Sequence, residues 1–204
     1  MPLPNTLPTK EAIQAMEPFS GLALEKIHCV ATAEDAARAL DELMREEAVG
    51  FDTESKPTFK KGERSEGPHV LQFATLEKAF LFQAHLTETR EAMLELLRSD
   101  RLKKVGFDLR GDLRQLSDRF GVKPMALLDL DRVFKRHGFR NFVGARSAIA
   151  LLLQQRFQKS KSTSTSNWSA EVLSEKQLIY AANDAYAAIR VFHALKELEF
   201  SEAS

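Results

Sequence analysis

The sequence predicts an α/β domain in which a mixed β-sheet carries helices on both faces. Short apolar segments with strand character come first, and longer segments of helical period then alternate with further strands. Hydrophobic residues make up 44% and charged residues 28% of the chain, which is typical of a globular protein. The 204 residues correspond to about one domain. We expect an N-terminal arm over residues 1–20 and a single domain over residues 21–204, because no linker divides the chain.

The expected strands are short, apolar and rich in β-branched or aromatic residues. They cover residues 27–31, 48–53, 70–75, 79–83, 103–107 and 126–130. The third and fourth of these should form a hairpin, because only a short polar turn around Glu77 and Lys78 separates them. The non-periodic segment 56–68 is expected to be a loop.

The expected helices show apolar residues at spacings of three and four. They cover residues 33–47, 88–99, 109–120, 145–157 and 174–198, with shorter helices near 10–16 and 131–137. Thr32 is placed to cap the first long helix, and Gly121 to end the helix over 109–120. Residues 158–167 are polar and low in complexity, which favours a mobile loop.

The charges are unevenly distributed although the net charge is zero. Residues 101–161 contain 15 Lys and Arg but only 5 Asp and Glu, a net charge of +10. This excess would attract phosphates if the charges shared one face, and it would cancel if they were spread over several. The sequence leaves both arrangements open.

The sequence also indicates the compartment. It contains no apolar run of about 18 residues, so no membrane span is expected. No signal peptide is visible at the N-terminus, which favours a cytoplasmic location. Cys29 is the single cysteine, so it has no disulfide partner within the chain, and its apolar neighbours favour burial.

A first candidate site lies at the end of the expected strand 48–53. Asp52 and Glu54 are two residues apart, so their carboxylates should point to the same face of the sheet. Two such charges repel each other unless a divalent cation lies between them. A solvent-exposed pair is the more common outcome for this spacing alone.

Two further segments contain acidic candidates. Asp108 and Asp112 follow the expected strand 103–107, where Asp108 could simply cap the next helix and Asp112 could be a solvated charge of its first turn. Tyr180 and Asp184 are four residues apart and share one face of the last helix. The alanines around them would also suit a plain contact between helix and sheet.

Taken together, these segments resemble the DEDDy subgroup of the DEDD 3′→5′ exonucleases, in particular the exonuclease domains of ribonuclease D and Werner-type proteins. The resemblance extends from about residue 27 to residue 198. It rests on Phe-Asp-Thr-Glu at 51–54, Val-Gly-Phe with Gly-Asp at 105–112, and Tyr-Ala-Ala-Asn-Asp at 180–184. It implies a ribonuclease H-like sheet flanked by helices on both faces.

The resemblance also implies an activity and a site. The chain would hydrolyse the 3′-terminal phosphodiester of DNA or RNA and release 5′-mononucleotides. Two divalent cations, Mg²⁺ or Mn²⁺, would be bound by four carboxylates while a tyrosine helps to orient the attacking water. By motif, these residues are Asp52, Glu54, Asp112, Asp184 and Tyr180.

The contacts to the nucleic acid follow less directly. Candidate phosphate contacts are Arg110 and Arg114 beside Asp112, and Lys159 and Lys161 before the third motif. Phe107 and Trp168 are candidates for stacking on a base of a single-stranded or recessed 3′ end, although a place in the core is the usual role of such rings.

Two other classes of protein would also fit parts of this sequence. One is a catalytically silent nucleic-acid-binding module of the same fold, and the other is a phosphohydrolase of free nucleotides. A complete set of four carboxylates and the tyrosine argues against the silent module, and the basic segment 101–161 argues for a longer polyanion. DNA and RNA stay equally open as substrates, and so does the oligomeric state.

Overall fold

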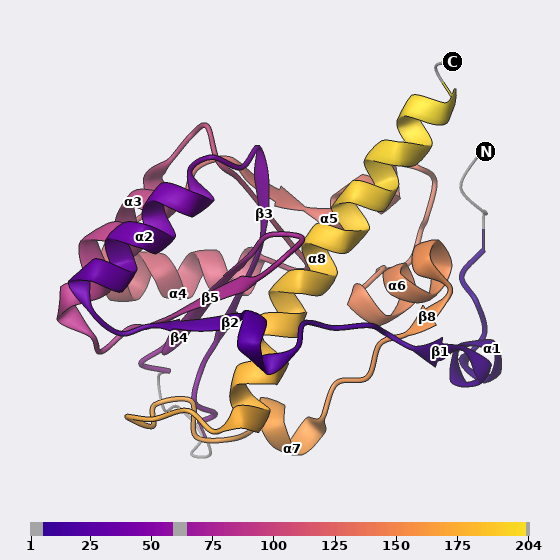
Figure 1. Ribbon diagram of the computed structural model, residues 1–204. Helices are drawn as coiled ribbons and strands as arrows, with labels where there is room; N and C mark the ends of the chain where they lie inside the picture. Colours follow the sequence, from indigo (N-terminus) through magenta and orange to yellow (C-terminus); the bar gives the residue numbers. More distant parts are fainter. Residues whose placement is uncertain (1–5, 59–64, 203–204) are drawn as a thin grey trace.

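The computed structural model describes residues 6–58 and 65–202. Its centre is a six-stranded sheet with the strand order β2-β5-β4-β3-β6-β7 (Figure 1). The strands are β2 (Ile27–Val30), β3 (Ala48–Glu54), β4 (Val70–Ala74), β5 (Ala79–Gln83), β6 (Lys103–Gly106) and β7 (Leu127–Asp129). All six lie where the sequence predicts a strand.

The sheet is mixed in direction. β3, β4 and β5 form an antiparallel meander, whereas β2 pairs with β5, and β6 with both β3 and β7, in the parallel sense. Asp52 of β3 faces Gln72 of β4 in this register. The strand that carries the first candidate motif therefore lies near the middle of the sheet, with neighbours on both sides.

Helices cover both faces of the sheet. α2 (Ala33–Leu43), α3 (Arg90–Arg98) and α4 (Arg110–Phe120) pack on one face, around a core that includes Phe51, Phe73 and Phe82. α5 (Leu130–Arg136), α6 (Ala145–Leu153) and α8 (Glu175–Glu202) pack on the other, around Val70, Trp168 and Ile189. The predicted fold class, a mixed sheet between two layers of helices, is confirmed.

α8 is the longest helix and crosses the sheet diagonally (Figure 1). It packs most extensively on β3, and also on α6 and β4. The small side chains of Ala181, Ala182 and Ala185 are fully buried, which allows the helix to approach the strands closely. Residues of α6 and α8 belong to the same hydrophobic cluster, so α8 is packed against this helix as well as against the sheet.

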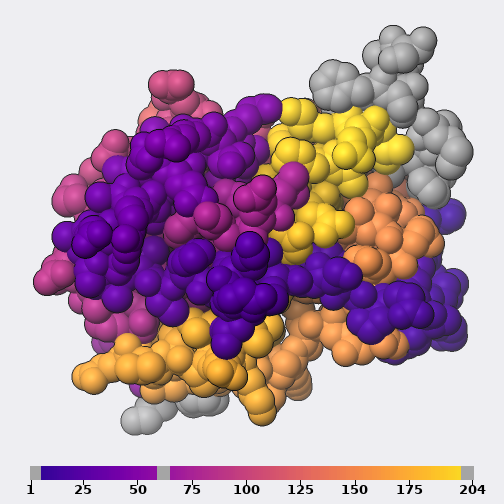
Figure 2. All heavy atoms as spheres, in the orientation of Figure 1, coloured from indigo at the N-terminus to yellow at the C-terminus, as the bar shows by residue number. Residues whose placement is uncertain are grey.

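The N-terminal arm is bound to the rest of the molecule by a second, two-stranded sheet. After α1 (Lys10–Ala15), β1 (Glu17–Pro18) pairs in parallel with β8 (Gln155–Arg156). The ring of Phe19 then packs edge-on against Phe157 at a centroid distance of 5.2 Å. Figure 2 shows the arm in indigo directly against the orange segment that contains β8. The sequence did not predict this pair of strands.

Several other expectations are corrected by the structure. The helix predicted over 145–157 ends at Leu153, because Gln154 has a positive φ of 54° and the chain continues into β8. The segment 158–167 was expected to be a loop, but it contains a short helix, α7 (Lys161–Ser164). Cys29 is exposed rather than buried, since β2 is an edge strand.

The helix starts and ends differ in detail from the predictions. Thr32 caps α2 as predicted, and Asp35 completes a reciprocal capping box, but the helix ends at Leu43 instead of residue 47. Two single turns of 3₁₀ helix, η1 (Leu24–Lys26) and η2 (Thr87–Thr89), precede β2 and α3. None of the described helices combines the length and the apolar character that crossing a membrane would require.

Candidate active site

The site forms where α8 crosses β3. A Cβ atom added to Gly50 would lie 1.8 Å from the backbone oxygen of Ala185. Any side chain at position 50 would therefore push the helix away from the strand. Since Asp184 precedes Ala185 on the helix and Asp52 lies two residues after Gly50 on the strand, this close approach brings the first and the last of the four motif carboxylates together.

Three of the predicted carboxylates converge at this crossing. Asp52, Glu54 and Asp184 each place one oxygen within 4.8 Å of the other two. Asp184 is buried, whereas the other two residues are half-buried at the end of the strand. A separation of this size allows one cation to contact all three groups.

Burial and mutual repulsion raise the pKa values of these groups. Burial, together with the charge of Asp184, raises the pKa of Asp52 to about 7. Burial, reinforced by the charge of Asp52, raises the pKa of Glu54 to about 9. Burial raises the pKa of Asp184 to about 6 although Lys159 opposes the shift. The site thus holds more acidic groups than it can keep ionised without a cation.

Asp112 approaches the cluster from a different element, the first turn of α4. Its carboxylate accepts a hydrogen bond from the hydroxyl of Thr53, which lies between Asp52 and Glu54. Burial and the charge of Asp52 raise the pKa of Asp112 to about 7. All four predicted carboxylates therefore belong to one electrostatic unit, although only three of them form the tight group.

Lys159 places a positive charge inside this cluster, and the charge of Arg146 also acts on Asp184. Its ammonium lies 2.7 Å from Oδ2 of Asp184 and 5.9 Å from the centre of the Tyr180 ring. The neighbouring carboxylates Asp184 and Asp52 raise the pKa of Lys159 despite its burial. The sequence placed Lys159 among the candidate phosphate contacts, and the structure brings it into the carboxylate group.

Tyr180 lies one turn before Asp184 on α8, as the spacing predicted. Burial and the charge of Asp184 raise the pKa of its hydroxyl, so the group keeps its proton at neutral pH. Its ring packs at 5.9 Å against that of Trp168. Trp168 is fully buried and its indole N–H donates to Ser164, which leaves no face of the ring for a base. We therefore correct the role of Trp168 from stacking on substrate to supporting Tyr180.

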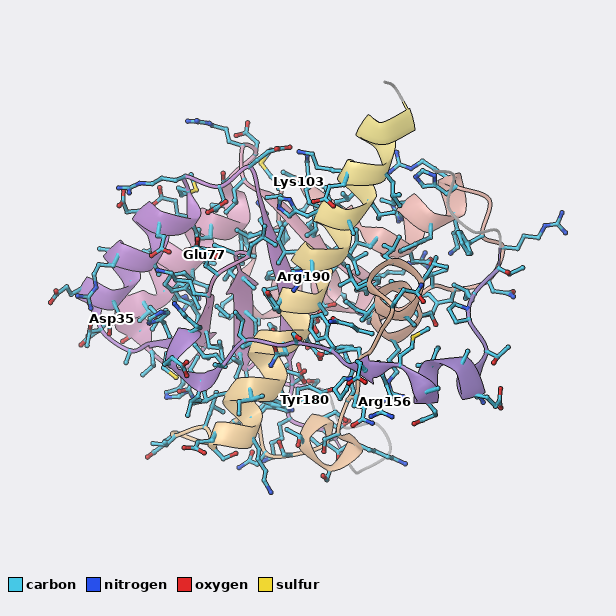
Figure 3. All side chains as sticks on the ribbon, turned by 45° about the vertical axis from the view of Figure 1, so that its right-hand side comes forward. Asp35, Glu77, Lys103, Arg156, Tyr180 and Arg190 are labelled. Atoms are coloured by element: carbon cyan, nitrogen blue, oxygen red, sulfur yellow. The ribbon has the colours of Figure 1, made fainter. Side chains whose placement is uncertain are left out.

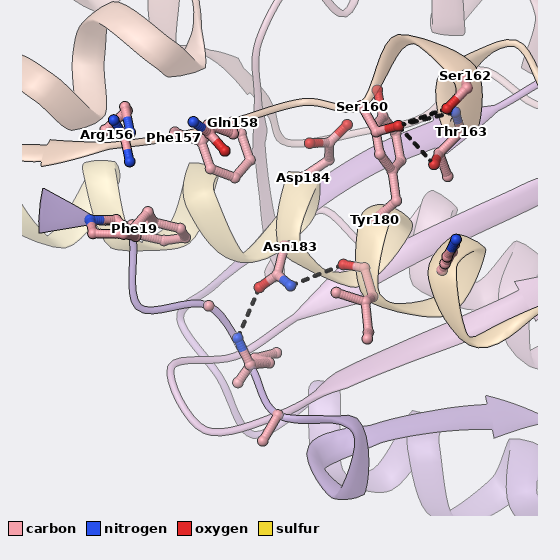
Figure 4. A pocket seen from close by; sticks show the side chains of 16 residues that line it. Phe19, Arg156, Phe157, Gln158, Ser160, Ser162, Thr163, Tyr180, Asn183 and Asp184 are labelled. Atoms are coloured by element: carbon pink, nitrogen blue, oxygen red, sulfur yellow. Dashed lines mark hydrogen bonds between the residues drawn. The ribbon is translucent and has the colours of Figure 1, made fainter. Parts of the chain in front are cut away.

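Two cavities open onto the carboxylates. One, of about 370 Å³, is lined by Asp52 and Asp184 together with Phe107, Phe142 and Arg146. The other, of about 710 Å³, is lined by Tyr180 and Asp184, by the segment 156–160 and by the end of the arm (Figure 4). There Asn183 accepts a hydrogen bond from the backbone of Leu22, which ties the chain just after the arm to α8, and it donates one to Ile179 within the helix.

Phe142 and Arg146 are site residues that sequence reasoning missed. Phe142 is 56% exposed, which is unusual for a phenylalanine, and it lines the 370 Å³ cavity beside the predicted Phe107. The guanidinium of Arg146 donates to the backbone oxygen of Lys159 at 3.0 Å. Neither residue lies in a motif, so only the folded chain brings them to the carboxylates.

Other predicted contacts lie outside these cavities. Arg110, Arg114 and Lys161 are exposed and line neither of them. Asp108 does not cap α4, because Leu109 occupies the cap position; the backbone N–H of Asp108 instead donates to Asp129. Contacts of Arg110, Arg114 and Lys161 with the nucleic acid stay predictions.

The positive charges of residues 101–161 are not all free to interact with a nucleic acid. Several of its cations are already bound to neighbouring groups, as Lys103 is to Glu47, Lys135 to Asp131 and Lys159 to Asp184. Lys104 is fully buried and donates to the backbone of Ser99. Only part of the excess positive charge is therefore open to a polyanion.

The donor set fits a hard divalent cation. Every ligand atom in the tight group is a carboxylate oxygen, which suits Mg²⁺ or Mn²⁺ better than zinc. On the neighbouring strand, Gln72 faces Asp52, and its buried amide has no hydrogen-bond partner among the described residues. An unpaired amide beside repelling carboxylates is typical of a site that is completed by an ion and its water.

Comparison with known proteins gives the family. A family model described as 3′-5′ exonuclease matches residues 27–198. The mouse bifunctional 3′-5′ exonuclease/ATP-dependent helicase WRN is 29% identical over 85% of this chain and 12% of its own length. Ribonuclease D of Gluconacetobacter diazotrophicus is 31% identical over 82% of this chain and 42% of its own length. The chain thus spans less than half of either relative.

Solved structures agree in fold. The EXO domain of Nibbler from Aedes aegypti superposes with a TM-score of 0.73 at 20% identity, over 89% of this chain and 91% of that one. Ribonuclease D of Escherichia coli gives 0.72 at 21% identity, over 86% of this chain and 46% of that one. Carboxylates on the central strand and the crossing helix, together with the match over residues 27–198, identify the chain as a member of the 3′-5′ exonuclease family.

Proposed function

We propose that this 3′-5′ exonuclease removes nucleotides from a single-stranded or recessed 3′ end by a two-metal-ion reaction and releases 5′-mononucleotides. The observation that carries the proposal is the convergence of Asp52, Glu54 and Asp184 within 4.8 Å, with Asp112 linked to them through Thr53. Acidic groups with pKa values raised as far as about 9 favour a site that functions with bound cations.

Divalent cations bound by these carboxylates would activate a water and stabilise the leaving 3′ oxygen. The charge of Asp52 raises the pKa of both Glu54 and Asp112, so Asp52 interacts with the carboxylates of two different elements. It is therefore the residue best placed to serve two cations. Glu54 and Asp184 would complete one set of ligands, and Asp112 the other.

Tyr180 orients rather than deprotonates the attacking water. A phenol whose pKa is raised above its usual range keeps its proton at neutral pH, so it is a hydrogen-bond donor there. It is held in place by the packing of its ring on Trp168. The subgroup with a tyrosine at this position is the one that the spacing of Tyr180 and Asp184 supports.

The nucleoside at the 3′ end would occupy the 370 Å³ cavity. The rings of Phe107 and Phe142 line it, and one ring could stack on any base, which suits an enzyme without a strong sequence preference. One of the similar solved structures is ribonuclease D of Trypanosoma brucei in complex with RNA U12. Single-stranded RNA is therefore a substrate to test beside DNA.

A 5′-labelled single-stranded oligonucleotide, as DNA and as RNA, tests the proposal. With Mg²⁺ or Mn²⁺ we expect a ladder that shortens from the 3′ end, and EDTA or the variant Asp52→Asn should abolish it. Thermal unfolding of Asp52→Asn should show that the fold is retained, because the amide removes a repelling charge. An oligonucleotide that stays intact under every metal condition would contradict the proposal.

A further inference from the structure

A third cavity, of about 670 Å³, lies between the N-terminal arm and the body of the molecule. We call it the arm groove. One wall is formed by α1, with Lys10, Ile13 and Gln14, and the other by Arg146, Ser147 and the segment Arg156–Ser160. Figure 3 shows Arg156 beside the arm and near the end of α8 that carries Tyr180. Arg156 and Tyr180 also line the 710 Å³ cavity together.

We propose that the arm groove binds the sugar-phosphate backbone of the substrate strand on the 5′ side of the scissile bond. The inference rests on the proposed function, because it assigns to the arm a second part of the same substrate. It gives the arm a role that the exonuclease motifs do not contain.

The charge of the arm groove fits a polyanion. Four cationic side chains line it (Lys10, Arg146, Arg156 and Lys159), and its described lining contains no aspartate or glutamate. Lys10 and Arg146 are exposed, and neither forms an ion pair with any residue that the structure describes. Cations that are not held in a direct ion pair are open to phosphates, and the glutamine and serine side chains of the lining can donate further hydrogen bonds.

The arm groove is continuous with the active site. Arg146, Ser147 and Lys159 line both the arm groove and the 370 Å³ cavity that contains Asp52 and Asp184. Arg146 and Lys159 are also joined by a hydrogen bond of 3.0 Å between guanidinium and backbone oxygen. A strand whose 3′ end lies at the carboxylates can therefore pass Arg146 and continue under α1.

The walls of the arm groove are held in place by the fold. The parallel pairing of β1 with β8 sets the distance between the arm and the segment 156–160. The guanidinium of Arg156 donates to the backbone oxygen of Gln14 at 2.7 Å, and Phe19 packs on Phe157. A preformed groove loses little entropy when a flexible strand binds. Because Arg156 is committed to the arm, Lys10 and Arg146 are the better positions for a test.

Charge reversal at these two positions should leave the fold intact. Lys10 opens α1 and Arg146 lies in the first turn of α6, where a glutamate is favoured by the helix dipole. Lys123, which is exposed and lines none of the three cavities, provides a matched control. Thermal unfolding of Lys10→Glu, Arg146→Glu and Lys123→Glu should be close to that of the wild type.

The experiment measures binding without turnover. Fluorescence anisotropy of a labelled single-stranded oligonucleotide of about 12 nucleotides is recorded in Ca²⁺ over a range of salt concentrations. Lys10→Glu and Arg146→Glu should each raise Kd roughly tenfold and reduce the salt dependence of log K by about 0.7, whereas Lys123→Glu should change neither. For Lys10→Glu the loss should be much smaller with a dinucleotide, because two nucleotides bound at the carboxylates do not contact α1 in the proposed arrangement.

Two results would overturn the inference. One is an affinity for the long oligonucleotide that Lys10→Glu leaves unchanged, and the other is an equal loss for the dinucleotide and the long strand. Failure of the proposed hydrolysis is seen separately, because the wild type would then leave both substrates intact in Mg²⁺ and Mn²⁺. The anisotropy measurement does not depend on that outcome.

Discussion

The ammonium of Lys159 lies 2.7 Å from Oδ2 of Asp184, within the group of carboxylates where the proposed cations would bind. Lys159 precedes α7, whereas Asp184 belongs to α8, so the ion pair joins two separate parts of the site. A positive side chain at this place compensates part of the repulsion among Asp52, Glu54 and Asp184. It also competes with any cation that uses the same oxygen of Asp184.

We predict that Lys159→Met binds Mn²⁺ more tightly than the wild type, by roughly tenfold in Kd. The methionine fills a similar volume without the charge, so the competitor for Asp184 is removed. In EDTA the same variant should unfold at a lower temperature, because the buried carboxylate loses its partner. Calorimetric titration with Mn²⁺ measures the affinity, and Lys161→Met, at an exposed position, is the control. Equal affinities of wild type and Lys159→Met would show that the ion pair does not compete with the metal.

The stability of the metal-free protein should fall as the pH rises. The pKa values of Asp52 and Asp112 in the folded state are about 7, and that of Glu54 is about 9, all above those of an unfolded chain. Between about pH 4 and pH 9 the folded state therefore binds more protons than the unfolded state, so the free energy of unfolding decreases with pH. Each kcal/mol lost lowers Tm by roughly 2–4 °C for a chain of this size.

Metal ions should remove this pH dependence. Differential scanning calorimetry between about pH 5 and pH 9 gives Tm as a function of pH, first in EDTA and then with Mg²⁺ or Mn²⁺. This range covers most of the pH window in which the folded state binds more protons. A bound cation replaces the protons, so the stabilisation by metal should grow as the pH rises. A Tm that rises with pH in EDTA would contradict the raised pKa values of the carboxyl groups.

Tyr180→Phe separates positioning from metal binding. The ring and its packing on Trp168 remain, and only the hydroxyl is lost. We expect kcat to fall by about a hundredfold while the Kd for Mn²⁺ stays unchanged, because a phenol with a raised pKa keeps its proton and leaves the cation to the carboxylates. Rates from a labelled oligonucleotide and calorimetry with Mn²⁺ test the two parts. A variant as fast as the wild type would show that the hydroxyl does not orient the water.

Most of the fold could be predicted from the sequence because its signals are local. Apolar runs gave all six strands of the main sheet, and Thr32 marked the start of α2 by its own side chain. The two-residue strands β1 and β8 could not be predicted, since each is too short to show a period. They exist because residues 17–18 and 155–156, far apart in sequence, meet in space.

The residues of the site also fall into those that a local sequence signal predicts and those that it does not. Asp52 and Glu54 share a face because a strand repeats every two residues, and Tyr180 and Asp184 because a helix repeats nearly every four. Phe142, Arg146 and the ion pair of Lys159 with Asp184 carry no such period. They depend on how α6 and the segment before α7 pack around α8, which is tertiary information.

Gly50 has no side chain, and this allows α8 to approach β3 closely. In Gly50→Ala the new Cβ would lie 1.8 Å from the backbone oxygen of Ala185, and neither backbone can give way without separating strand and helix. We expect a loss of about 2 kcal/mol or more in the free energy of unfolding, together with weaker Mn²⁺ binding as Asp184 moves away from Asp52.

Gly111→Ala is the matched control for this substitution. Gly111 lies within α4, and a Cβ added there meets no other atom within 4 Å. Gly111 is the second residue of α4, and alanine is favoured over glycine in a helix, so this variant should be at least as stable as the wild type. Urea unfolding of both variants measures the two effects. If Gly50→Ala proved as stable as Gly111→Ala and bound Mn²⁺ as tightly as the wild type, close packing of α8 on β3 would not be what brings the carboxylates together.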